Sequence, residues 1–130
     1  MTQNKLRLSA RMAVGIGVFL PVAETARRIN QIAELKEVPA WIDDYVLGAI
    51  LVGGGYSILQ RKAANHGYLI AAWGIGVGAL FLSFLGQFEY FVTEEGDPGI
   101  FSTTLVAVVK GLILAVMLTG LNWSIRAVKQ

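Results

Sequence analysis

The feature that most constrains this chain is a set of long segments almost free of charge. The clearest runs from Phe101 to Gly120, with Lys110 as its one charged residue. A bilayer offers no water to bond backbone amides and carbonyls, so such a segment must be a helix that satisfies them internally. Across the chain 55% of residues are apolar and 15% are charged, whereas soluble domains carry about a quarter charged residues. The sequence therefore predicts an all-α, polytopic integral membrane protein.

The apolar segments number four, and a spanning helix needs about 20 residues. They predict transmembrane helices over residues 8–29, 41–60, 67–91 and 100–123, packed as a compact bundle that makes residues 1–130 a single domain. The polar residues 23–38 between the first two spans are expected to continue the first helix beyond the membrane and lie on its outer surface.

Basic residues near span ends predict the orientation, because cytoplasmic loops are enriched in lysine and arginine. Seven of them fall on one side of the predicted spans: Lys5, Arg7, Arg11, Arg61, Lys62, Arg126 and Lys129. Three fall on the other side, namely Arg27, Arg28 and Lys36, and the loop that contains Glu94, Glu95 and Asp97 has none. Both termini are therefore expected in the cytoplasm. Basic residues at span ends favour contact with lipid headgroups over nucleic acid.

Lys110 is the sharpest polar feature, since a helix that begins near Ile100 places it about 15 Å deep. A lysine near the bilayer centre costs about 2.5–3.5 kcal/mol on insertion scales. Its own helix offers no acid one turn away, so a countercharge must come from elsewhere. Polar residues of the first three spans cluster toward the predicted outer side: Glu24, Asp43, Asp44, Glu89 and Gln87. Asp44 is expected to approach Lys110 most closely, which predicts an intramembrane polar site; alternatively, Lys110 snorkels to the headgroups and the acids are ordinary interfacial charges.

Glycines form the second signal. Gly53, Gly54 and Gly55 make a smooth patch in the second span, and Gly74 and Gly78 form a small-xxx-small pair in the third. Glycines let membrane helices approach closely, so these five are predicted to pack helices. The helices concerned belong either to one bundle or to two copies of the chain.

Chemical groups are few. The chain has no cysteine and His66 is its one histidine, so no thiolate or bis-histidine metal site is expected, and no cofactor. Catalytic motifs are not found, and an embedded enzyme ranks third among the hypotheses. The leading hypothesis is a non-enzymatic component of a bacterial plasma membrane that acts through helix association, scaffolding or assembly. Its expected partners are the lipid bilayer and either further copies of itself or another membrane protein. The alternative is a small channel or transporter with a polar route through Asp44 and Lys110.

Overall fold

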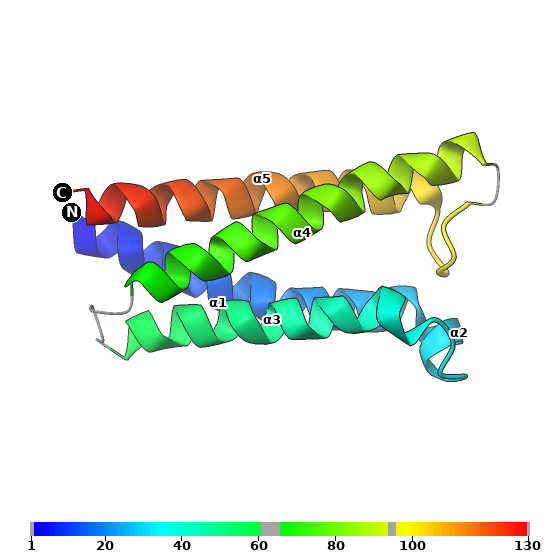
Figure 1. The fold of residues 1–130 in the computed structure, drawn as a ribbon, viewed down its shortest axis with the longest axis horizontal. Helices are drawn as coiled ribbons and strands as arrows, with labels where there is room; N and C mark the ends of the chain where they lie inside the picture. The colour runs from blue at the N-terminus through cyan, green and yellow to red at the C-terminus, as the bar shows by residue number, and fades with distance from the viewer. Residues whose placement is uncertain (1, 61–65, 94–95, 130) are drawn as a thin grey trace.

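The computed structural model describes residues 2–60, 66–93 and 96–129. The helices in chain order are α1 (Thr2–Arg27), α2 (Ile29–Ile32), α3 (Val38–Leu59), α4 (His66–Val92) and α5 (Thr103–Val128). The four long helices pack together (Figure 1), which confirms the predicted all-α bundle. Arg61, Lys62, Glu94 and Glu95, used above to predict the orientation, lie outside the described residues.

Neighbouring long helices run antiparallel and form a closed ring. Helix α1 packs against α3 and α5, and α4 packs against the same two helices. Both chain ends therefore lie at one end of the bundle (Figure 1), and residues 96–102 before α5 lie at the other. The two ends are called the terminal end and the loop end below.

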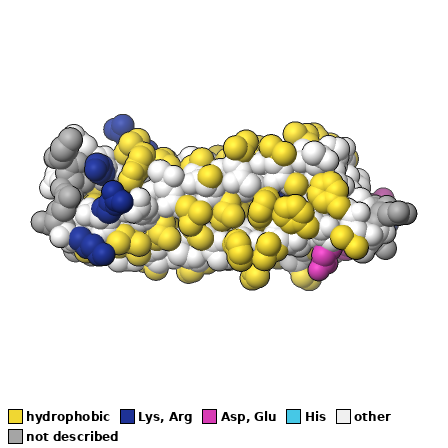
Figure 2. Space-filling view, turned by 90° about the horizontal axis from the view of Figure 1, so that it is seen from above, with side chains coloured by type: hydrophobic (Ala, Val, Ile, Leu, Met, Phe, Trp, Pro, Cys, Tyr) yellow, Lys and Arg dark blue, Asp and Glu magenta, His cyan; other side chains and the backbone are white. Residues whose placement is uncertain are grey.

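All four long helices are long and apolar enough to cross a membrane. Helix α5 has 26 residues, so it is about 39 Å long, close to a bilayer with its headgroup regions. Large apolar side chains such as Val22, Leu82 and Leu112 are exposed on the outside. Hydrophobic side chains cover the middle of the face in Figure 2, and lysine and arginine side chains gather near the terminal end. The chain is a four-span helical membrane protein.

The helix limits differ from the predicted spans mainly where a helix continues past the apolar segment. Helix α1 begins at Thr2 and α5 ends at Val128, because a helix can run on into the headgroup region where hydropathy no longer marks it. Helix α5 begins at Thr103, where the Ser102 side chain accepts a hydrogen bond from the Leu105 N–H at 3.2 Å. Lys110 therefore lies about 10 Å from the helix start instead of about 15 Å.

The connection between α1 and α3 is not a long helical extension. Helix α1 ends at Arg27, and the four-residue α2 follows a break at Arg28, whose φ is −112°. Leu35 and Glu37 have φ values of 52° and 50°, so the backbone turns sharply before α3 begins. The predicted surface helix over residues 23–38 is thus wrong in extent.

Small residues bring α1 and α3 closest together. A Cβ atom on Gly17 would lie 2.7 Å from the Gly48 carbonyl oxygen, and one on Gly55 would lie 2.9 Å from Val14 Cγ2. Gly54 is also buried, and its Cβ would meet Ala72 of α4 at 3.1 Å. Side chains at these positions would force the backbones apart.

The other predicted packing glycines lie elsewhere. Gly53 is exposed, with the Tyr68 hydroxyl oxygen 3.9 Å from the place a Cβ would take. Gly74 and Gly78 are exposed on α4, and a Cβ on either would meet nothing within 4 Å. They do not pack helices within this chain; whether they pack against a second copy stays a prediction.

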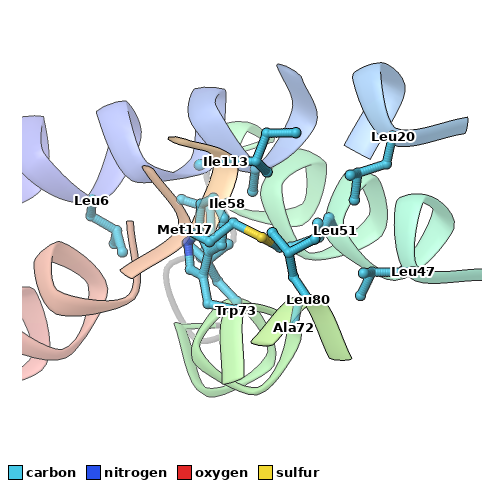
Figure 3. Packing of buried hydrophobic residues seen from close by; sticks show 13 residues of the cluster. Leu6, Leu20, Leu47, Leu51, Ile58, Ala72, Trp73, Leu80, Ile113 and Met117 are labelled. Carbon is cyan, nitrogen blue, oxygen red and sulfur yellow. The ribbon is translucent and has the colours of Figure 1, made fainter. Parts of the chain in front are cut away.

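The core is apolar along most of the bundle, with Leu51, Trp73 and Met117 fully buried (Figure 3). Near the terminal end it contains a polar cluster that the sequence did not reveal. The Trp73 Nε1–H donates to Ser9 Oγ at 2.8 Å, and the Ser9 hydroxyl lies 2.6 Å from that of Ser124. Ser9 also donates to the Gly120 carbonyl at 2.8 Å. These bonds tie α1, α4 and α5 together while satisfying buried polar groups.

Candidate functional site

A pocket of about 320 Å³ lies toward the loop end of the bundle. Its walls are largely apolar and come from α1, α4 and α5, including Leu20, Leu80 and Val106. Charged groups also line it: Glu24 and Arg27 on α1, Asp44 on α3 and Lys110 on α5. An apolar cavity with a few convergent polar groups is the usual form of a ligand site.

Arg27 joins the end of α1 to the loop before α5. Its Nη1 donates to both oxygens of Glu24, at 3.0 and 2.7 Å. Its Nε and Nη2 donate to Asp97, with the shortest bond at 2.9 Å between Nη2 and Oδ2. The Ile100 N–H donates to the Arg27 carbonyl at 2.9 Å. A guanidinium that spans two carboxylates is well paired, which is what a buried charge requires.

Asp97 is the centre of the loop-end cluster, and its side chain is 0% exposed. Besides Arg27, its carboxylate accepts the Gln87 Nε2–H at 3.0 Å and the Gly99 N–H at 2.8 Å, while its own N–H donates to Thr103 Oγ1 at 2.9 Å. Burial acts to raise the pKa of Asp97, but the hydrogen bonds from Arg27, Gln87 and Gly99 outweigh it and hold that pKa below its usual range. Asp97 is therefore a stable anion.

Arg28 is the second buried arginine. Its Nε lies 2.6 Å from Glu24 Oε1 in an ion pair that lacks hydrogen-bond geometry, and its Nη1 donates to Gln31 at 2.8 Å. The exposed Glu37 lies 3.7 Å from Nη1. The two arginines that counted against the predicted orientation are thus both paired with carboxylates, which offsets the cost of placing them at this end.

Lys110 is held by neutral acceptors. Its Nζ donates to Gln87 Oε1 at 3.0 Å and to the Ser83 carbonyl at 3.4 Å. Gln87 is fully buried, and its Nε2 turns the other way, to Asp97 and to the Thr103 carbonyl at 3.4 Å. The amide thereby connects the Lys110 cation to the Asp97 anion. An ionised carboxylate can only accept hydrogen bonds, so Asp97 favours the orientation in which the Gln87 NH2 group faces it and the amide oxygen faces Lys110.

The predicted polar site is brought together in part. Lys110, Asp44 and Glu24 line one pocket, and Gln87 bonds Lys110 directly. The ion pairs among the described residues do not include one between Asp44 and Lys110. Asp43 and Glu89 are exposed and do not line the pocket.

Sequence reasoning missed Asp97, Thr103 and the central role of Arg27. The sequence places Asp97 in the loop before the fourth span, and its carboxylate there closes a turn by accepting the N–H of Gly99, two residues on. A usable signal was the pair Arg27 and Arg28, which stand on the side poor in basic residues and therefore require buried or interfacial acids.

Comparisons of the chain with models of known protein families, with curated proteins and with solved structures find no match. The functional argument therefore stands on the site itself.

Proposed function

We propose that this protein is a non-enzymatic membrane component that binds an amphiphilic molecule taken from the surrounding bilayer. The observation that carries the proposal is the pocket toward the loop end, where Lys110 and Asp44 line largely apolar walls beside the paired charges of Glu24 and Arg27. Apolar walls suit a hydrocarbon portion, and the two charged side chains suit a polar head. Binding, release or transfer of such a molecule is the activity that follows.

The packing below the pocket favours binding over a continuous polar route. Toward the terminal end, Leu51 and Met117 are fully buried and Leu47 and Ile113 are nearly so (Figure 3). An ion or a water column would have to cross this close-packed apolar layer within one chain, at a large desolvation cost. The pocket is therefore better suited to hold a molecule than to pass one across the membrane.

The seam between α1 and α5 is the entrance we infer. These helices are bonded through Ser9 and Gly120 near the terminal end and diverge toward the loop end (Figure 1). Phe19 of α1 and Leu105 of α5 both line the pocket, and they are 43% and 49% exposed. The surface they face is covered by lipid in a membrane, so a bilayer molecule can enter sideways without crossing water.

Filling the pocket tests this function. Ala23→Phe places a ring in the pocket, and Val22→Phe places the same ring at the neighbouring position, which does not line it. Both proteins are reconstituted in nanodiscs of mixed phospholipids and analysed by native mass spectrometry. The wild type and Val22→Phe are expected to retain one lipid per chain, and Ala23→Phe to lose it. Equal retention by the two variants would refute the proposed pocket.

We also propose that both termini face the cytoplasm of a bacterial inner membrane. Exposed basic residues at the terminal end (Lys5, Arg7, Arg11, Arg126 and Lys129) support this orientation. Because the chain has no cysteine, single substitutions report cleanly: Gln3→Cys is expected to resist a membrane-impermeant maleimide in intact cells, and Glu34→Cys to react. The opposite pattern would invert the topology.

A homo-oligomer is a second proposal, favoured by the exposed position of Gly74 and Gly78. With nothing within 4 Å of either Cβ position, this part of α4 is smooth and open to another helix. Replacing both glycines by leucine is expected to reduce association in detergent, measured by energy transfer between labelled copies. Gly86→Leu is the control, since Gly86 also meets nothing within 4 Å but lies outside the pair. Unchanged association would reject this surface.

A further inference from the structure

The pocket has opposite charges on separate walls. We infer that it selects a zwitterionic phospholipid headgroup, with its phosphate at Lys110 and its primary ammonium at Asp44. This inference rests on the proposed amphiphile-binding function and names the chemical class of the ligand.

Lys110 has capacity for an anion. An ammonium has three N–H donors, and the described residues supply acceptors for two of them, Gln87 Oε1 and the Ser83 carbonyl. Both acceptors are neutral, so the charge of Lys110 is not matched by direct contact with a carboxylate. A phosphate oxygen in the pocket would take the third N–H and supply the missing charge.

Asp44 has the complementary capacity. Its backbone N–H donates to Asp43 Oδ1 at 2.9 Å, but no residue in the described part of the chain donates to its side-chain carboxylate. A primary ammonium would satisfy that carboxylate with charge-assisted hydrogen bonds. A purely anionic head would meet Lys110 favourably but would be repelled by Asp44.

The neighbouring charges leave these two groups as the ones open to a ligand. Glu24 forms ion pairs with Arg27 and Arg28, and Arg27 also forms an ion pair with Asp97. Each of these charges already has an opposite partner within 2.9 Å. The unmatched pair on the pocket wall is therefore one cation and one anion, which matches a zwitterion in both sign and number.

Depth and size suit a headgroup. Asp44 is six residues into α3 and Lys110 seven into α5, so both lie about 10 Å along their helices from the loop end. That is just below the headgroup region of a bilayer whose apolar core is about 30 Å thick. A pocket of about 320 Å³ is at the small end for ligand sites. It suits a head and the first methylenes, with the acyl chains leaving between Phe19 and Leu105 into the membrane.

The experiment measures which lipid is retained. The protein is placed in nanodiscs of equimolar phosphatidylethanolamine and phosphatidylglycerol with identical acyl chains, and retained lipids are identified by native mass spectrometry. The wild type is expected to prefer phosphatidylethanolamine about tenfold, the ratio that one charge-assisted hydrogen bond supports. Asp44→Asn should shift the ratio toward phosphatidylglycerol, and Lys110→Gln should lower retention of both lipids. The control, Asp43→Asn, changes an exposed neighbouring carboxylate outside the pocket and should keep the wild-type ratio.

Several outcomes would overturn the inference. A wild type with equal or greater retention of phosphatidylglycerol, or an Asp44→Asn ratio equal to that of the wild type, would reject the zwitterionic head. Displacement of the lipid by soluble phosphoethanolamine at equal concentration would reject a lipid as the source. Because a misfolded variant loses both lipids alike, a changed ratio reports the site and not stability. If Ala23→Phe expels a lipid for which no headgroup preference exists, the proposed function stands and this inference falls.

Discussion

Gly17→Ala and Gly15→Ala add the same methyl group two positions apart on α1, but only the one at Gly17 meets atoms of another helix. A Cβ on Gly15 would meet nothing within 4 Å. A Cβ on Gly17 would lie 2.7 Å from the Gly48 carbonyl oxygen and 3.0 Å from the Val52 nitrogen, and ordinary contact begins at 3.4 Å. Those are backbone atoms, which no rotamer change can move. Helices α1 and α3 must therefore separate by roughly 0.7 Å, the difference between 3.4 and 2.7 Å.

Such a gap forfeits about a quarter to a half of the attraction between the atoms across it, and overpacking of this kind costs about 1–3 kcal/mol. Alanine also favours the helix over glycine by about 1 kcal/mol, but that gain applies to both variants. The difference between their free energies of unfolding therefore isolates packing. Gly17→Ala is expected to be about 1–3 kcal/mol less stable than Gly15→Ala. Unfolding in mixed micelles of rising dodecyl sulfate content, followed by circular dichroism, measures it. Equal midpoints would refute the close approach of α1 and α3.

Three further outcomes are expected from the polar clusters. Arg27→Gln should lower the free energy of unfolding by about 3 kcal/mol, because it leaves Asp97 buried without its cation; Lys36→Gln, at an exposed ion pair, should change it by less than about 0.5 kcal/mol in the same assay. The low pKa of Asp97 means that the unfolded state binds more protons, so the stability difference between the wild type and Asp97→Asn should be fully present above about pH 4 and disappear as the pH falls through the folded-state pKa. A difference that persists in acid would contradict the ionised carboxylate. Trp73→Phe should cost about 1 kcal/mol by removing the bond to Ser9, and a midpoint equal to that of the wild type would show that this bond contributes nothing.

The position of Asp97 shows where sequence reasoning stopped. Its partner Arg27 is 70 residues away, and nothing local to the Gly96–Gly99 turn distinguishes a surface aspartate from a buried one. Lys110 was identifiable, because a charge within an uncharged run is conspicuous by itself. Its acceptor Gln87 was also among the predicted site residues, because it belongs to the polar residues that cluster toward the predicted outer side.

The glycines also show which features the local sequence reveals and which depend on the packing of the helices. Gly54 and Gly55 on α3 and Gly74 and Gly78 on α4 carry the same local signal, yet the first two are buried against neighbouring helices and the last two are exposed. Gly17 and Gly48, which form the closest approach, were not predicted. A glycine shows that a helix can approach closely there; which face turns inward depends on the other three helices.

The sequence by itself determined that this protein lies in a lipid bilayer and that its apolar segments are helices. The free energy of transferring a segment into lipid is nearly a sum of contributions from its own residues, so it can be judged from the local sequence. Because lipid offers the backbone no hydrogen-bond partners, each span must be a helix. The tertiary structure alone decided which charges meet, which glycines touch and where the pocket lies. Those outcomes depend on contacts between residues distant in the chain, and their energies arise only when helices are packed at a specific rotation and depth.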